Sequence, residues 1–496
     1  RLAHDEAFAL SLDVAARRRR ATGARGAGLP IDAALHARLV ARLPHAPTAA
    51  QARVLEELRD DLLAANGRPM SRLLQGDVGS GKTLLAFYAM LAAVECGRQA
   101  ALMAPTEILA AQHLRGLRAL LARAYGERAP RVAFVGAATS AAERAALRGG
   151  EAALAVGTHA LQAAGLRFRD LALTVVDEQH RFGVLQRSRF RAKGRDSHLL
   201  VMTATPIPRT LALTAYGELD VSVLDELPPG RAPRATELIE HERQRALWAE
   251  LRAAVARGER GYVVCPSIGA ARGAAAGAAR PVGARPASRS DEDDEEAGHS
   301  VAATLVRMRR ALGAGVRVGA VHGRMPPLER DAVLEAFRSG ALDVLVATVL
   351  VEVGLDVPEA TFVVLPDASR FGLAQMHQIR GRVGRGGRPG RCLLLLPLPP
   401  GPARARAEAL VATDDGFRLA EQDLALRGPG ELLGTAQSGL PDFAALDPVR
   451  DVELLATTRP LAFAAAEGLS NEALAAMRAR VFPVMELRAE NLLAGG

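Results

Sequence analysis

The apolar residues of this chain gather in short runs that suit strands buried on both faces. The runs beyond residue 70 are 100–104, 172–176, 199–202, 262–265, 316–321, 344–347, 361–365 and 392–396. Stretches with helical spacing separate them. The pattern therefore predicts repeated strand–helix–strand units and parallel sheets, which is an α/β fold.

A Pro/Gly cluster at 225–233 divides these strands into two groups and is typical of a linker. We therefore expect two α/β domains of similar size, over 46–227 and 228–400. Residues 1–45 predict a helical lead-in, with leucines four apart on one face, and 401–496 predict a helical C-terminal region. Residues 269–300 lack a hydrophobic period and turn acidic, so a disordered insertion is expected there.

The composition fits a folded protein of a reducing compartment. Of the 496 residues, 49% are apolar, and the three cysteines stand far apart, which excludes a disulfide framework or zinc ribbon. Few, widely separated cysteines are typical of a cytoplasmic protein, because thiols stay reduced in the cytoplasm. No long uncharged apolar run indicates a membrane span. The first residues show neither a signal peptide nor an initiator Met, so the chain is expected to be a fragment.

The net charge of +8 fits a nucleic-acid partner. The basic residues are almost all arginine, as a genome rich in Arg codons would give. Only two are lysine, Lys82 and Lys193. One of these two lysines stands where a phosphate-binding loop requires it.

Residues 76–83 match the pattern GxxxxGK[ST] in full. A predicted strand at 71–75 precedes them and an apolar helix at 84–94 follows, which is the context that the motif needs and that a chance Gly-rich turn would lack. Backbone N–H groups would converge on phosphates at a helix N-terminus. Lys82 would neutralise phosphate charge and Thr83 would bind Mg²⁺. The predicted nucleotide-binding residues are Gly76, Gly79, Ser80, Gly81, Lys82 and Thr83.

An apolar strand at 171–176 ends in two carboxylates, Asp177 and Glu178. Alone, they could be a solvated acidic pair. Beside a phosphate loop, Asp177 is predicted to join the Mg²⁺ shell and Glu178 to polarise the attacking water.

Residues 177–180, with the phosphate loop, resemble the DEAD/DExH group of superfamily 2 helicases. The other motifs of that group follow in its order at 104–107, 157–159, 203–206, 321–325, 347–356 and 378–385. More narrowly, Leu74-Gln75, 180–183 and 207–210 resemble the RecG family of bacterial ATP-dependent DNA helicases. The tail at 416–439 is similar to that family's translocation motif.

The resemblance implies two RecA-like parallel-sheet P-loop lobes in tandem with a helical tail. It also implies ATP and Mg²⁺ as cofactors, and a double-strand DNA translocase that remodels stalled forks and Holliday junctions in recombination and repair. The implied partners are branched DNA and a single-strand-binding protein. We expect the protein to be a monomer and to have no membrane partner.

The resemblance also assigns roles to individual residues. Arg382 and Arg385 would complete the ATP site, unless the arginines of 380–391 form a basic nucleic-acid loop. Gln51 would contact adenine, although His45 and Pro47 replace the usual aromatic residue and Leu. The two histidines among the predicted DNA contacts could instead be structural. The predicted DNA contacts are Thr106, Thr158, His159, His322, Gly323, Thr348 and Gln437.

Two departures from the family leave other functions open. No segment before residue 45 is long enough for the family's N-terminal wedge domain, and 269–300 does not resemble the family. A wedge-less chain could be only a DNA-stimulated ATPase or a nucleotide-switched DNA-binding module. A transcription-repair coupling translocase and an RNA helicase are further alternatives. The first would need a polymerase-binding module that we do not find, and the tail disfavours the second.

Overall fold

The computed structural model describes most of the chain and divides it into two units. The described residues are 2–21, 28–63, 69–177, 197–204, 219–228, 232–266, 291–323, 325–348, 357, 359–384, 387–395, 401–427, 446, 451–470, 472–474 and 476–477. The first unit comprises 1–227 and 427–496, and the second comprises 228–426. The chain crosses between them within the Pro/Gly cluster at 225–233.

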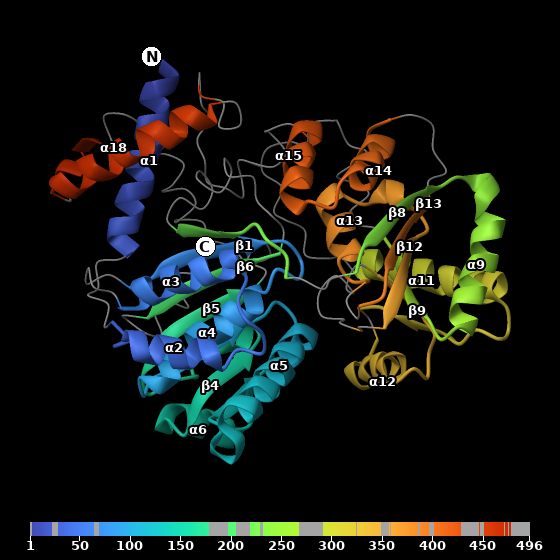
Figure 1. Ribbon diagram of the computed structural model, residues 1–496, viewed down its shortest axis with the longest axis horizontal. Coiled ribbons are helices and arrows are strands. Elements are labelled where there is room, and N and C mark those ends of the chain that lie inside the picture. Colours follow the sequence, from blue (N-terminus) through green and yellow to red (C-terminus); the bar gives the residue numbers. More distant parts are fainter. Residues whose placement is uncertain are drawn as a thin grey trace. The chain divides into compact units, whose positions relative to one another are not determined.

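The first unit holds a parallel sheet in the order β3-β4-β2-β5-β6-β1-β7. Figure 1 labels β1, β4, β5 and β6 of this sheet. Its strands are β1 Ser71–Gly76, β2 Gln99–Met103, β3 Arg131–Val135, β4 Ala152–Gly157, β5 Leu171–Asp177, β6 His198–Thr203 and β7 Asp220–Leu224. Its helices are α2 Ala33–Ala41, α3 Ala49–Leu63, α4 Lys82–Glu95, α5 Glu107–Tyr125 and α6 Ala141–Gly149. The strand β5 is buried throughout, as a strand covered on both faces should be.

The strand order positions the first unit's predicted site. Strand β6 pairs with β1 on one side and with β5 on the other, all in parallel. The loop after β1 and the carboxylate at the end of β5 therefore lie at the same edge of the sheet, only one strand apart. Ligands of open α/β sheets bind at this carboxyl edge.

The second unit holds a parallel sheet in the order β10-β11-β9-β12-β13-β8. Its strands are β8 Arg234–Ile239, β9 Arg260–Cys265, β10 Val318–Val321, β11 Val344–Thr348, β12 Ala360–Leu365 and β13 Gly390–Leu395. Its helices are α9 Gln244–Ala256, α11 Asp291–Leu312, α12 Pro327–Arg338, α13 Leu373–Arg380, α14 Pro402–Ala412 and α15 Gly416–Arg427. Two parallel β-sheets, each with helices between its strands, confirm the predicted α/β fold class.

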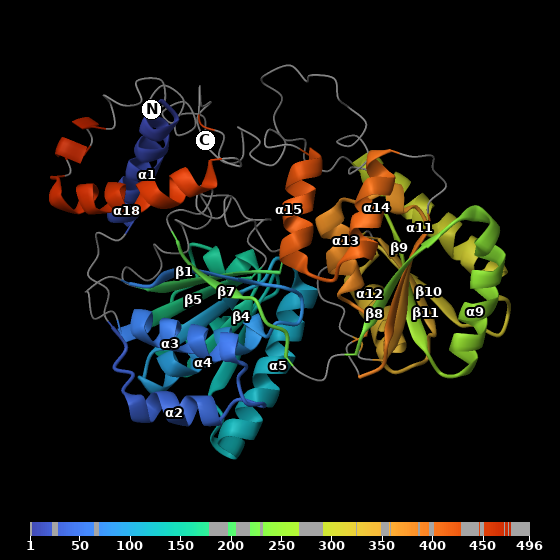
Figure 2. The ribbon, with the colours of Figure 1, turned by 45° about the horizontal axis from the view of Figure 1, so that its top comes forward.

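The first and last helices of the chain pack against each other. Helix α1, Leu2–Ala21, crosses α18, Val452–Gly468 (Figure 2), and small side chains such as Ala16 and Ala462 meet in their shared core. Glu6 also accepts a hydrogen bond from the backbone N–H of Leu446 at 2.7 Å. The lead-in predicted at 1–45 thus includes a helix that packs with the C-terminal region. The region 401–496 itself is shared between the two units.

One sequence expectation differs from the structure. Residues 291–300 belong to α11, whereas disorder was expected for 269–300. An acidic run is compatible with the start of a helix, because the helix dipole favours negative charge there. Residues 267–290 lie outside the described part of the chain. Within that part, we find no helix with the length and apolar content that a membrane crossing requires.

Candidate nucleotide-binding site

The loop between β1 and α4 has the backbone of a phosphate cradle. Gly79 and Gly81 have φ values of 85° and 93°, a region that favours glycine. A Cβ on Gly81 would lie 2.4 Å from Nε2 of Gln51, and one on Gly76 would lie 2.6 Å from Oγ of Ser80. The loop therefore needs glycine at these positions, and its shape fits the phosphates of a nucleotide at the N-terminus of α4.

Lys82 is held inside this loop. Its ammonium group donates to the carbonyl oxygens of Gly76 and Asp77 at 2.7 and 2.8 Å, and only 9% of the residue is exposed. A buried ammonium group is stabilised by nearby groups of opposite charge. The loop thus places a positive charge where a phosphate group would neutralise it. Ser80 is fully buried in the same turn, and Thr83 follows Lys82 in the first turn of α4.

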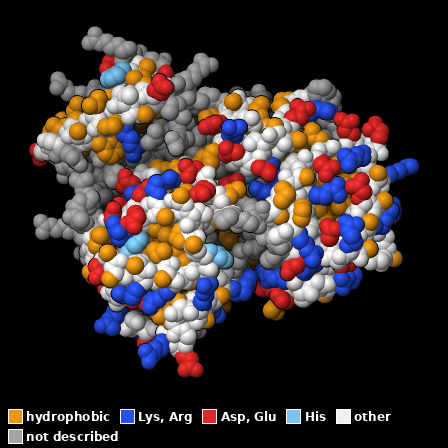
Figure 3. Space-filling view, in the orientation of Figure 1, with side chains coloured by type: hydrophobic (Ala, Val, Ile, Leu, Met, Phe, Trp, Pro, Cys, Tyr) orange, Lys and Arg blue, Asp and Glu red, His pale blue; other side chains and the backbone are white. Residues whose placement is uncertain are grey.

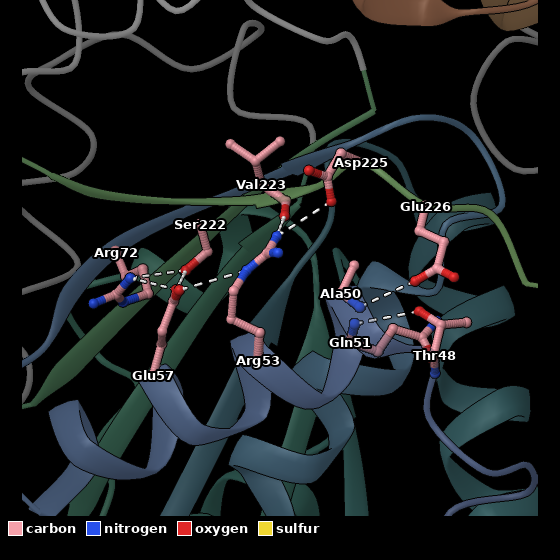
Figure 4. Close-up of polar contacts among 10 residues, drawn as sticks. All are labelled: Thr48, Ala50, Gln51, Arg53, Glu57, Arg72, Ser222, Val223, Asp225 and Glu226. Carbon is pink, nitrogen blue, oxygen red and sulfur yellow. Dashed lines mark hydrogen bonds and ion pairs between the residues drawn. The ribbon is translucent and has the colours of Figure 1, made fainter.

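Gln51 holds the phosphate loop from α3. Its side-chain amide donates to the carbonyl oxygen of Ser80 at 2.8 Å and accepts from the backbone N–H of Thr48 at 3.1 Å. Figure 4 shows Gln51 and Thr48 at the start of α3, where Glu226 accepts from the N–H of Ala50 at 3.1 Å. In this structure Gln51 supports the loop backbone. Its contact with adenine stays a prediction.

Ion pairs fix α3 against the sheet (Figure 4). Arg72 of β1 donates to Glu57 at 3.0 Å and to the hydroxyl of Ser222 at 2.8 Å, and Arg53 donates to Asp225 at 3.2 Å. The element that carries Gln51 is thereby attached to β1 and to the segment after β7.

Asp177 is the carboxylate at the end of β5, and it is 8% exposed. Its Oδ2 lies 2.7 Å from Nε2 of His113, on α5. Asp177 and Thr83 both lie at the carboxyl edge of the sheet, so these two residues could together hold a Mg²⁺ ion. Glu178 lies outside the described residues.

His113 is a site residue that the sequence did not indicate. Its only signal is a histidine among the apolar residues that α5 buries, which include Leu109 and Leu117. A histidine in such a place is usually structural. Only the fold shows that its partner is Asp177.

The predicted DNA contacts of the first unit occupy loops at the same edge of the sheet. Thr106 caps α5 by accepting from Leu109 N–H at 3.3 Å, and the buried Thr158 caps the short 3₁₀ helix His159–Gln162. His159 is exposed. The two threonines therefore have structural roles as helix caps.

In the second unit, His322, Gly323 and Thr348 stand at the ends of the neighbouring strands β10 and β11. The Thr348 hydroxyl is buried and has no hydrogen-bond partner in the described part of the chain. Gln437 lies outside that part. Apart from Gln437, the predicted DNA contacts of each unit thus lie along one edge of that unit's sheet.

The arginines at 380–391 divide into different roles. Arg380 is fully buried and donates to the carbonyl oxygens of Leu410 and Thr413 at 2.7 and 2.9 Å. Arg391 pairs with carboxylates, whereas Arg388 is exposed and Arg382 is half-buried after α13. Arg385 lies outside the described residues. Arg380 and Arg391 are therefore structural, which leaves Arg382 among the candidates for phosphate.

Charges of both signs are mixed over the face drawn in Figure 3. Lys and Arg side chains alternate with Asp and Glu there, so the net charge of +8 does not form one basic surface on that face.

Comparisons with known proteins identify the family. The model for DEAD/DEAH box helicases matches residues 48–214, that for the helicase conserved C-terminal domain matches 296–387, and that for ATP-dependent DNA helicase RecG, domain 3, C-terminal, matches 413–475. The ATP-dependent DNA helicase RecG of Mycobacterium tuberculosis strain H37Rv is 43% identical over an alignment of 505 positions that covers 97% of this chain. The chain belongs to the RecG family. The RecG of Escherichia coli O127:H6 is 42% identical over 93% of this chain.

Solved structures agree with this assignment. A RecG structure bound to a three-way DNA junction matches 92% of this chain with a TM-score of 0.69 and 36% identity. Yeast Dbp5 bound to RNA and ADP BeF3 is 17% identical with a TM-score of 0.54, and it shares the fold alone. This chain spans 66% of the mycobacterial relative and 56% of the solved RecG chain.

Proposed function

We propose that this chain is an ATP-dependent double-strand DNA translocase that remodels stalled forks and Holliday junctions in recombination and repair. The observation that carries the proposal is Lys82, buried within a loop of positive-φ glycines at the sheet edge that also carries Asp177. Membership of the RecG family supports DNA as the partner, since a solved relative is bound to a branched junction.

The residues of the loop would bind and orient ATP. The backbone N–H groups of 79–83 would hold the phosphates, Lys82 would neutralise their charge, and Thr83 and Asp177 would hold Mg²⁺. Bound Mg²⁺·ATP supplies the phosphoryl group and a cation that offsets its negative charge. We assign the positioning of water to Glu178. Arg382 and Arg385 are assigned to the γ-phosphate, where one arginine can contribute about 10³–10⁵ in rate.

The DNA contacts would be to the sugar–phosphate backbone, because such contacts position a motor without reading bases. We assign them to Thr106, Thr158, His159, His322, Gly323, Thr348 and Gln437. We further propose that the protein is a monomer and acts in the cytoplasm on branched DNA. A single-strand-binding protein would be a further partner.

The match of 413–475 to a RecG domain favours this function over transcription-repair coupling or RNA unwinding. A nucleotide-switched binding module remains distinct from a motor in one respect: it would not turn over ATP faster on DNA.

Phosphate release with and without forked DNA tests the proposal. We expect strong stimulation by the fork, and loss of turnover in Lys82→Ala and in Glu178→Gln. Arg118→Ala, an exposed change on α5, is the control and should turn over as the wild type does. Turnover that forked DNA does not change, or that survives Lys82→Ala, would contradict the proposal.

A further inference from the structure

We propose that His113 is a positioning residue that fixes the carboxylate of Asp177 and so sets the affinity of the site for its divalent cation. The inference rests on the proposed function, since it assumes that Asp177 helps to hold the Mg²⁺ that accompanies ATP. It adds a residue from α5, an element outside the phosphate loop and outside β5.

The position of His113 is fixed by the fold. Helix α5 follows β2 directly and is capped by Thr106, and β2 pairs with β5 up to Met103 and Val176. The buried face of α5 therefore lies beside the end of β5, where Asp177 stands. Neither partner belongs to a loop that could move without disturbing the sheet.

The burial of both groups makes their contact strong. His113 is 5% exposed and Asp177 is 8% exposed, and Nε2 lies 2.7 Å from Oδ2. A buried imidazole or carboxylate without a hydrogen bond is strongly disfavoured. An Nε2–H group donates to the carboxylate whether or not the other ring nitrogen carries a proton. The hydrogen bond therefore restrains Oδ2 and with it the orientation of the carboxylate.

Such partners matter to metal sites. Groups that hydrogen-bond a metal-binding side chain orient it, and their loss typically weakens metal affinity by about 10–100-fold. A purely structural histidine of α5 would instead affect stability or nucleotide binding regardless of the cation. The two roles therefore differ in their dependence on Mg²⁺.

Three substitutions separate these roles. His113→Gln keeps an N–H donor at about the reach of Nε2. His113→Asn is equally polar but too short, and His113→Leu removes the donor. The binding of a fluorescent ATP analogue would be measured in EDTA and across a Mg²⁺ titration, with electron paramagnetic resonance of bound Mn²⁺ as a direct readout of the metal.

We expect His113→Asn and His113→Leu to raise the Mg²⁺ and Mn²⁺ concentrations at half-saturation by about 10–100-fold. Nucleotide affinity in EDTA should change by less than about twofold, and His113→Gln should restore most of the cation affinity. If His113→Leu does not fold, the Gln and Asn variants still decide the question. Cation affinity equal to that of the wild type in His113→Asn would overturn the proposal, as would equal losses in EDTA and in Mg²⁺. Lys82→Ala should lose nucleotide under both conditions. A wild type that binds no nucleotide would overturn the proposed function together with this inference.

Discussion

Arg380 gives the sharpest stability prediction, because it is a fully buried guanidinium within a motif otherwise assigned to phosphate. It donates to the carbonyl oxygens of Leu410 and Thr413, contacts Nδ1 of His377 at 2.9 Å and pairs with Asp414 at 3.0 Å. The contacts join α13 to the last turn of α14 and to the segment that connects α14 with α15. Replacement by Met keeps an unbranched apolar side chain, although a shorter one, and removes every donor.

The magnitude follows from the groups left behind. Each buried carbonyl that loses its donor costs about 1–3 kcal/mol. The Asp414 side chain is half-exposed, so water can solvate its charge and it adds little. Breaking a buried charged contact typically costs about 3–5 kcal/mol, which agrees with the loss of two carbonyl partners. For a unit of this size, Arg380→Met should lower the Tm by roughly 6–20 °C.

Differential scanning calorimetry is the appropriate assay, since two units need not unfold in one transition. We expect the transition of the second unit to move and that of the first to stay. Arg388→Met, an exposed change in the same motif, should leave both transitions within about 1 °C. Arg382→Met should lower phosphate release with little change in Tm. If Arg380→Met melts as the wild type does, the assignment of a structural role to Arg380 is wrong.

Two further predictions concern the first unit. Gly81→Ala should lower nucleotide affinity in the same fluorescence titration, because its φ is 93° and the new Cβ would meet Gln51. Gly258→Ala, with a similar φ of 83° in open space, should only lower stability, by about 1–2 kcal/mol. Nucleotide affinity in Gly81→Ala equal to that of the wild type would contradict this prediction. For Glu95, burial alone would raise the pKa, but hydrogen bonds, the strongest from Tyr125, outweigh burial and lower the pKa below its usual value. That carboxylate therefore contributes stability that is present above about pH 4.3 and lost as the pH falls through the lowered pKa. Tyr125→Phe should lower the free energy of unfolding at pH 7 by about 1 kcal/mol and by less in acid, as urea denaturation at both pH values would show; an equal difference at the two pH values would contradict it.

The sequence predicted the central strands other than β4 and the edge strand β10, but it missed the other three edge strands. Of the missed edge strands, β7 and β8 carry charged or polar residues that interrupt an apolar run, and β3 has only four apolar residues after Arg131. Strand β4 is rich in Ala, which has a weak preference for strands. A search for continuous apolar runs finds the centre of a parallel sheet because only the centre is covered twice.

Site features that depend on neighbouring residues could be predicted from the sequence, whereas those that depend on residues distant in the chain could not. The phosphate loop could be predicted because its residues are consecutive and each has a local reason. The roles of His113 and Arg380 depend on partners 64 and 30 or more residues away. No local pattern gives these pairs. The packing of α1 on α18 is likewise a contact between the two ends of the chain.

A crystal structure with Mg²⁺ and a non-hydrolysable ATP analogue would test the central claim most directly. The account predicts the β- and γ-phosphates over the backbone N–H groups of 79–83, with Lys82 turned from the loop carbonyls to the phosphates. It also predicts a cation about 2.1 Å from Oγ1 of Thr83, with Asp177 bound to it directly or through one water. A nucleotide bound elsewhere, with Lys82 still donating to Gly76 and Asp77, would contradict the account.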